Sequence, residues 1–192
     1  MNDQRPYVVG LGGTTDPNSS SERALASALE AAREQGARTR LLTARELELP
    51  MYAPGVSERS EAARIFLEEV AAADAVIVST PAYHGSISGL LKNAIDYLED
   101  LREAERPYLD GRPVGCIVCA HGWQGTGTAL ASLRAIVHSL RGWPTPLGVT
   151  INTSQGVFGE DGRVSDPDLS GRIRVLAEQV TRFGAPLSDP SY

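Results

Sequence analysis

The sequence predicts an α/β fold in which a parallel sheet of five strands is covered by helices on both faces. Short apolar runs alternate with stretches of helical period along the 192 residues. The strand-like runs are apolar along most of their length, as they are in sheets that are buried on both faces. Strands that alternate with helices pair in parallel, because each helix returns the chain to the same end of the sheet. We expect residues 1–192 to form one domain whose tail, residues 184–192, is frayed.

Each expected strand is a short apolar run that stops at glycine, proline or a polar loop. The first run ends in two glycines, and the third, with the sequence AVIVST, stops at Pro81. The strands are predicted at residues 5–13, 37–43, 75–80, 113–120 and 147–151.

The expected helices carry apolar residues at every third or fourth position. Gly36 follows the first of them, at the place where a glycine commonly stops a helix. Residues 46–58 contain Pro50 and Pro54, and we expect them to be irregular. The helices are predicted at residues 20–35, 60–73, 86–102, 128–140 and 169–183.

Composition and charge exclude several classes of protein. The chain is 42% apolar and 22% charged, which is ordinary for a globular protein in water. Its net charge of -6 argues against nucleic acid or an anionic membrane as the main partner. No apolar stretch approaches the roughly 20 residues that span a bilayer. The first ten residues lack the cationic flank and apolar stretch of a signal peptide, so we expect a cytoplasmic protein.

The two cysteines form a C-x-x-C pattern, which is a redox pair in some folds. Here Cys116 and Cys119 lie inside the predicted strand 113–120, where side chains three positions apart point to opposite faces. A bridge between them would be strained. We therefore expect two buried thiols.

Three loops are expected to meet at one edge of the sheet, because ligands of such sheets bind beyond the carboxyl ends of the strands. The loop after the first strand, GGTTDPNSSSERAL, is rich in hydroxyls at the start of a helix, a place that suits a phosphate group. It has neither the lysine of a Walker A loop nor a G-x-G-x-x-G pattern. An alternative needs no ligand, because Ser19 and Glu22 form the S-x-x-E pattern of a capping box. The candidate phosphate ligands are Thr14, Thr15, Ser19, Ser20 and Ser21.

The loops after the third and fourth strands allow close approach of a flat ring. In the first of them Gly85 permits such an approach and Tyr83 offers an aromatic face, although Tyr83 alone fits an ordinary turn equally well. In the second, AHGWQGTGTAL, glycines alternate with polar residues. His121 there could serve as an acid, as a hydrogen-bond partner of the ring, or in no role.

Neither a metal site nor a catalytic triad is expected. His84, His121 and His138 have no cysteine or carboxylate partners at ligand spacing. Ser86 and Ser88 have no G-x-S-x-G elbow and no base nearby.

The segment PAYHGSISGLLKNAIDYL, residues 81–98, resembles the signature of the NAD(P)H-dependent FMN reductases. That family includes the flavin reductases of alkanesulfonate monooxygenase systems and related azo- and quinone reductases. The turn, its glycine and serine, and the helix containing KNAID agree over eighteen positions. The first loop and LPMYAP at residues 49–54 are also similar, so the resemblance covers most of the chain.

The resemblance implies a flavodoxin-like three-layer sandwich with strand order 2-1-3-4-5, and it implies FMN and NADPH (or NADH) as cofactors. The phosphate loop of the family has the form S-x-R-x-x-S-x-[NT], onto which Thr14, Ser19 and Ser21 map as polar positions. Asp16 stands where the family usually has arginine, which places a carboxylate near a phosphate. We hypothesise that the flavin is held more loosely here, or that Asp16 points into solvent.

The resemblance also assigns the ring site and the chemistry. Hydride passes from nicotinamide C4 to flavin N5, so no side chain need act as acid or base, and backbone N–H groups would stabilise charge at flavin N1–C2=O. Family members are dimers or tetramers, so we expect residues 86–102 to contribute to a subunit interface. The residues expected to line the ring are Pro81, Ala82, Tyr83, His84, Gly85, Ser86, Ala120, His121 and Gly122.

The function expected from these features is NAD(P)H-dependent reduction of FMN, with reduced FMN released to a monooxygenase. An FMN-dependent azo- or quinone reductase is the first alternative. A flavodoxin-type electron carrier is the second, although such carriers tend to be more acidic than this chain. A hydrolase of the same fold without flavin is the third.

Overall fold

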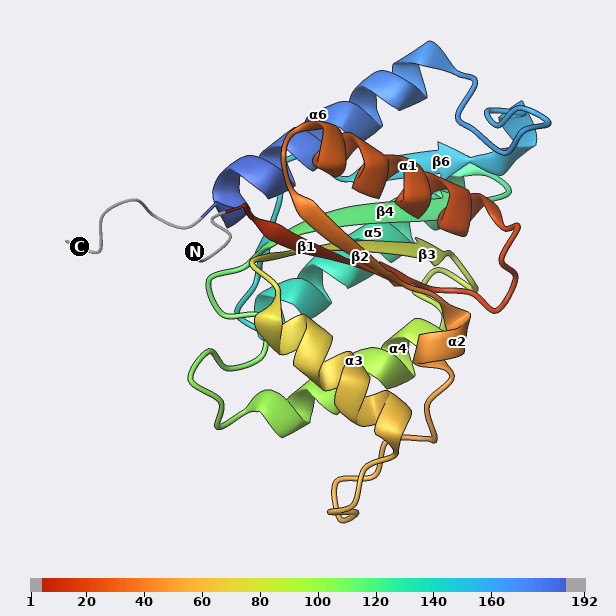
Figure 1. Ribbon diagram of the computed structural model, residues 1–192. Helices are drawn as coiled ribbons and strands as arrows, with labels where there is room; N and C mark the ends of the chain where they lie inside the picture. The colour runs from red at the N-terminus through yellow and green to blue at the C-terminus, as the bar shows by residue number, and fades with distance from the viewer. Residues whose placement is uncertain (1–4, 186–192) are drawn as a thin grey trace.

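The predicted strands and helices follow one another in the predicted order (Figure 1), and two short elements that were not predicted, a helix at Ala44–Leu47 and a strand at Trp143–Pro144, are inserted among them. The computed structural model describes residues 5–185, so most of the predicted frayed tail lies outside the described residues. The strands are β1 (Tyr7–Gly12), β2 (Arg38–Leu42), β3 (Ala75–Pro81), β4 (Pro113–Ala120), β5 (Trp143–Pro144) and β6 (Val149–Asn152). The α-helices are α1 (Ser20–Glu34), α2 (Ala44–Leu47), α3 (Glu61–Ala72), α4 (Gly89–Asp96), α5 (Trp123–Ser139) and α6 (Pro167–Gly184). Two 3-10 turns complete the set, η1 (Tyr97–Leu101) and η2 (Thr153–Gln155).

All strands are parallel, in the order β2-β1-β3-β4-β5, with β6 also paired to β4. β5 pairs with the first two residues of β4, and β6 pairs with its last four, so the two short strands share one edge. The predicted fifth strand is β6. β5 was not predicted, because two residues are too few to form an apolar run. The predicted parallel sheet and its strand order are confirmed.

Helices cover both faces of the sheet and make a three-layer sandwich (Figure 1). Successive residues of the central strands point to opposite faces, so Val9 packs with α3, α4 and α5 while Val8 packs with α1 and α6. Each face thus has its own core of aliphatic side chains. Within residues 5–185, no helix has both the length and the apolar character needed to cross a bilayer.

Two predicted helix starts are wrong. The fourth α-helix begins at Gly89 instead of residue 86, because residues 83–86 form a tight turn and Ser88 Oγ accepts the Leu91 N–H (3.2 Å) as the N-cap. α5 begins at Trp123 instead of residue 128 and runs through two glycines. Each glycine costs about 1 kcal/mol in a helix relative to alanine, an amount that burial of the apolar face of α5 can offset.

The irregular segment after α2 is bound to α4, and this contact joins two of the segments that carry the family resemblance. The Asn93 side-chain amide donates to Leu49 O (3.1 Å) and Pro50 O (3.0 Å), and its Oδ1 accepts the Tyr52 N–H (2.8 Å). Tyr97 Oη also donates to Pro50 O (2.9 Å). The asparagine of KNAID therefore positions the LPMYAP segment.

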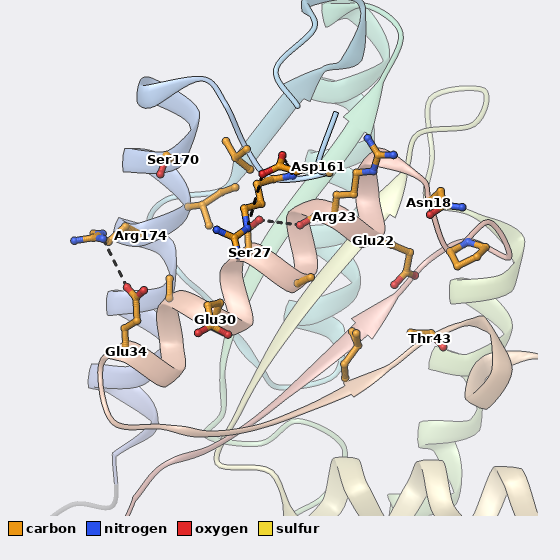
Figure 2. Close-up of a pocket in the computed structure, with 18 of the residues that line it drawn as sticks. Asn18, Glu22, Arg23, Ser27, Glu30, Glu34, Thr43, Asp161, Ser170 and Arg174 are labelled. Carbon is orange, nitrogen blue, oxygen red and sulfur yellow. Dashed lines mark hydrogen bonds and ion pairs between the residues drawn. The ribbon is translucent and has the colours of Figure 1, made fainter. Parts of the chain in front are cut away.

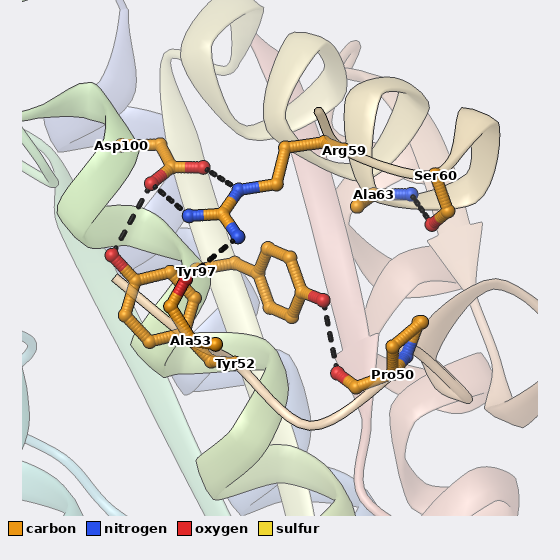
Figure 3. Close-up of polar contacts among 8 residues, drawn as sticks. All are labelled: Pro50, Tyr52, Ala53, Arg59, Ser60, Ala63, Tyr97 and Asp100. Carbon is orange, nitrogen blue, oxygen red and sulfur yellow. Dashed lines mark hydrogen bonds and ion pairs between the residues drawn. The ribbon is translucent and has the colours of Figure 1, made fainter. Parts of the chain in front are cut away.

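Arg59 secures the far end of the same segment (Figure 3). Its guanidinium forms a two-point pair with Asp100, with Nε 2.6 Å from Oδ2 and Nη2 2.8 Å from Oδ1. It also lies over the rings of Tyr52 and Tyr97, at 4.8 and 5.3 Å from their centroids, and donates to Ala53 O (3.0 Å). A planar, always-charged group with several donors suits this combination of contacts.

Candidate functional site

The loops after β1, β3 and β4 meet at the carboxyl edge of the sheet, as the topology predicts. Gly13 lies so close to β3 that a Cβ atom built on it would come within 2.8 Å of Thr80 Cα, so a larger residue there would force the loops apart. The Ala82 N–H donates to Cys119 O (2.7 Å), which ties the β3 loop to β4. These contacts bring all three loops into one site.

The first loop ends in a capped helix with free donors. Ser19 Oγ accepts the Glu22 N–H (3.2 Å) and lies 3.1 Å from Ser21 Oγ. Half of the predicted capping box is formed, because the Ser19 N–H donates to Asp16 O (3.1 Å) instead of to Glu22. Ser20 and Ser21 stand in the first turn, where N–H groups have no carbonyl partner within the helix. Capping by Ser19 and anion binding by the next two residues are therefore compatible.

The earlier part of this loop is shaped by two side chains. Thr14 is buried, and its Oγ1 accepts the Asp16 N–H (3.1 Å). Thr15 is exposed. Asp16 is exposed too, and its carboxylate accepts the Asn18 N–H (2.9 Å), which is a local turn contact. Of the two hypotheses for Asp16, this geometry favours the one in which it faces solvent.

Glu22 is a buried carboxyl beside this loop. Its Oε1 has no hydrogen-bond partner, and it lies against the backbone of Gly12, where a built Cβ would be 2.0 Å away. Burial, helped by the charge of Glu46, raises the pKa of Glu22 from 4.5 to about 7. Glu46 itself accepts hydrogen bonds from the N–H and hydroxyl of Thr43 (3.0 Å each).

The β3 loop forms a tight turn that presents Tyr83. The Tyr83 and Ser86 backbones exchange two hydrogen bonds (3.0 and 3.1 Å). His84 and Gly85 between them have φ values of 53° and 81°, the combination that defines a type I′ turn. Tyr83 is 57% exposed, so one face of its ring is open to a ligand.

This turn packs against α5 and is fixed at its two ends by a hydrogen bond. A Cβ built at Gly85 would lie 3.6 Å from Thr128 Cγ2 on α5. Thr80 Oγ1 accepts the Ser88 N–H (3.1 Å), and this hydrogen bond joins the two ends of the β3 loop. Pro81 and Ala82, at the start of the loop, are half-buried. The predicted ring residues of this loop are therefore on one connected surface.

The β4 loop supplies the third side. Ala120 ends the strand, His121 is exposed, and Gly122 has a φ of 142° that side-chain-bearing residues rarely adopt. A Cβ built at Gly122 would meet no atom within 4 Å, so the space beside it is open. A Cβ built at Gly125 would lie 3.7 Å from that of Ala120 and 3.9 Å from that of Ala82, which places these residues together.

The two cysteines are buried and unbridged, as predicted. Cys116 packs in the core on the α3 side and Cys119 in the core on the α1 side. Burial raises the pKa of each thiol to about 12, so neither is a ready nucleophile. Within residues 5–185, no three His, Cys, Asp or Glu side chains gather closely enough to hold a metal ion.

A family model of NADPH-dependent FMN reductases matches residues 6–156, which include all three loops. The chain belongs to the NADPH-dependent FMN reductase family. It is thus an NAD(P)H-dependent flavin oxidoreductase that uses FMN, as the sequence resemblance implies.

Individual relatives of this FMN reductase agree with the family assignment. It is 33% identical to an FMN-dependent NADPH-azoreductase of Staphylococcus aureus over 140 residues, which are 72% of this chain and 71% of that protein. In fold it is similar to FerB, a flavoenzyme NAD(P)H:(acceptor) oxidoreductase from Paracoccus denitrificans, with a TM-score of 0.74 and 21% identity over 93% of this chain and 98% of the other. It is also similar in fold to the NADH:FMN oxidoreductase EMOB in its apo form, with a TM-score of 0.71 and 19% identity over 97% and 92% of the two chains.

The edge formed by the three loops fits FMN. The first turn of α1 offers N–H groups and hydroxyls to a phosphate, and the open space at Gly122 and the exposed Tyr83 side chain can accommodate a flat ring. A groove of about 860 Å3 lies along the outer side of α1 beside α6, and it meets the first loop at Pro17, Asn18, Glu22 and Arg23 (Figure 2).

Sequence reasoning missed three features of this FMN reductase site. Thr80 anchors two loops, although as a strand residue it gave no signal beyond its place before Pro81. Glu22 was assigned only to a capping box, because the S-x-x-E pattern does not reveal that its carboxyl is buried. Trp123 was placed in a loop, whereas it opens α5 and is 51% exposed.

Proposed function

We propose that this FMN reductase binds FMN across the three loops, reduces it with NADPH and releases it reduced to a flavin-dependent monooxygenase. The meeting of the three loops at the carboxyl edge of the sheet, with unpaired N–H groups at the start of α1 and open space beside Gly122, supports the proposal most strongly. The proposed phosphate ligands are Thr14, Thr15, Ser19, Ser20 and Ser21. The proposed ring contacts are Pro81, Ala82, Tyr83, His84, Gly85, Ser86, Ala120, His121 and Gly122.

The residues of the chain would bind and orient FMN, which when bound would supply the hydride-transfer chemistry. N–H groups at the start of α1 hold the phosphate. The turn at Tyr83 supports one side of the ring. Backbone N–H groups of the β3 and β4 loops donate to the edge of the ring where negative charge develops.

A second candidate is reduction of an azo compound or quinone on the enzyme. The azoreductase from Staphylococcus aureus, 33% identical to this chain, favours it. The two candidates differ in the fate of the flavin, because an azo- or quinone reductase keeps its FMN while a flavin reductase exchanges it.

An FMN titration followed by NADPH oxidation assays tests the proposal. We expect a change in the flavin absorption spectrum on binding, and steady NADPH oxidation that depends on added free FMN. Turnover of an azo dye or quinone by protein-bound FMN, with no stimulation by free FMN, would support the second candidate. Bound flavin that NADPH does not reduce would indicate an electron carrier, and no flavin binding at all would defeat both candidates.

Replacing Asp16 by arginine tests the hypothesis of loose binding. If Asp16 stands near the phosphate, removing one like charge and adding an opposite one raises FMN affinity about 30-fold, from roughly 1 kcal/mol for each of the two changes at 4 Å in water. Asp16→Asn keeps the acceptor for the Asn18 N–H and is the matched control. Unchanged FMN affinity in Asp16→Arg would show that Asp16 does not loosen the site.

We also propose that the reductase is a homodimer or homotetramer and that it works in the cytoplasm. Met51 is 82% exposed and Val56 is 49% exposed on the segment bound to α4, which supports burial of this side against another subunit. The two unpaired thiols are compatible with a reducing compartment. Light scattering of Met51→Glu and wild-type protein measures the first part, and a purely monomeric wild type would refute it.

A further inference from the structure

A second groove lies next to the ring site, and none of its residues has a role so far. Its volume is about 670 Å3. It is bordered by the first residue of α5, the loop after β6 and the first two turns of α6. Its lining includes Trp123, Gln155, Asp168 and Arg172.

Trp123 forms the wall nearest the flavin loop. It follows Gly122 directly and is 51% exposed, so its indole is accessible to a ligand in the groove. An exposed indole face binds the π-face of a purine base by stacking. Because Ala120 pairs with Asn152 at the end of β6, this wall adjoins the edge where the ring is proposed to lie.

The polar residues of the groove suit the rest of a nucleotide. Arg172 is half-buried, and its Nη1 donates to Thr150 O (3.4 Å), which holds the guanidinium beside the sheet edge. It can pair with a pyrophosphate oxygen. Gln155 and Asp168 are exposed and can bond to the adenosine 3′-hydroxyl, which is free in both NADH and NADPH. Asp166, the other carboxylate of the groove, is already engaged as the cap of α6 by the Leu169 N–H (2.6 Å).

We propose that this groove binds the adenosine-diphosphate half of the nicotinamide cofactor, with the adenine stacked on Trp123 and the pyrophosphate at Arg172. The inference rests on the proposed function, because a nicotinamide that lies on the flavin ring leaves the adenosine-diphosphate half of the cofactor to bind to residues outside the ring site. This groove adjoins the proposed ring site and contains both an aromatic side chain, Trp123, and a cationic one, Arg172.

The chain has two tryptophans, which allows a direct binding test. Trp143 is 68% exposed on β5, away from the groove. The variant Trp143→Phe therefore keeps only Trp123, the reporter in the groove, and the variant Trp123→Phe keeps only Trp143 and serves as the control. ADP added to the flavin-free protein should quench the fluorescence of Trp143→Phe to a saturating limit and leave that of Trp123→Phe without saturable change. No saturable quenching in Trp143→Phe, or equal quenching in both variants, would overturn the proposal.

Kinetics with a truncated substrate give a second readout. Reduced nicotinamide mononucleotide carries the hydride but lacks the adenosine half. Trp123→Ala should raise the KM for NADPH about tenfold more than the KM for the mononucleotide, which is the size expected for loss of base stacking. Trp143→Ala should keep the wild-type ratio of the two KM values. An equal effect of Trp123→Ala on both substrates would overturn the assignment.

The two experiments separate failure of this inference from failure of the proposed function. The quenching test needs neither FMN nor turnover, so it can succeed in a protein that does not reduce flavin. Conversely, turnover with free FMN combined with an unchanged KM ratio in Trp123→Ala would leave the reductase intact and remove the groove from it.

Discussion

Replacing Glu22 by glutamine removes an ionisable group from a buried position that disfavours its charged form. Glu22 is 6% exposed, its Oε1 has no hydrogen-bond partner, and it touches the backbone of Gly12. Glu46 opposes ionisation of Glu22, and Glu46 is itself paired with Arg40, whose Nη2 lies 3.9 Å from Glu46 Oε1. Glutamine keeps the shape of the side chain and cannot ionise.

The size and sign of the effect follow from the pKa of Glu22. Its pKa is about 7 in the folded protein and near the ordinary 4.5 in the unfolded chain, so the folded state holds the proton more tightly. Stability from this group is full below about pH 4.5 and is lost as the pH rises through 7. The difference corresponds to about 3 kcal/mol, at 1.36 kcal/mol per pKa unit. Glu22→Gln should therefore be more stable than wild type by about 3 kcal/mol at pH 8 and nearly equal at low pH.

Urea unfolding at a series of pH values, followed by circular dichroism, measures this difference. Glu30→Gln is the matched control, because Glu30 lies on the same helix and is exposed. The free energy of unfolding of wild type should fall relative to Glu22→Gln between about pH 5 and pH 8, while wild type and Glu30→Gln stay parallel. A difference between wild type and Glu22→Gln that does not change with pH would refute the reasoning.

Other substitutions test the packing that shapes the site. Arg112 is fully buried and donates to three backbone carbonyls, so Arg112→Lys should lose about 3 kcal/mol in urea unfolding, and wild-type stability would contradict this account. Gly127→Ala should gain about 0.5–1 kcal/mol, because a Cβ there meets no atom within 4 Å in α5, and a loss would count against the helix start at Trp123. Gly13→Ala should lower the free energy of unfolding by about 1–3 kcal/mol through its contact with Thr80, and an unchanged melting temperature would show that the loops do not meet as described.

The layers of the fold and the convergence of the loops could be predicted from sequence, because they depend on periodicity and chain order. The fourth strand was predicted to the residue, since its apolar run has polar or glycine neighbours on both sides. The positions of Cys116 and Cys119 on opposite faces followed from the two-residue period of a strand.

Details that depend on tertiary contacts could not be predicted. Glycines in α5 suggested a loop, and only packing of the helix against the sheet overrides their preference. The positive φ of His84 arises in a turn whose ends are fixed by Thr80 and Ser88. Burial of Glu22 results from the approach of β1, which its local sequence does not encode.

A crystal structure of the protein with FMN would test the central claim most directly. The account predicts the phosphate within hydrogen-bond distance of the Ser20 and Ser21 N–H groups and the ring between the Tyr83 turn and Gly122. Flavin seated in the groove along the outer side of α1, or an edge filled by the protein's own side chains, would contradict it.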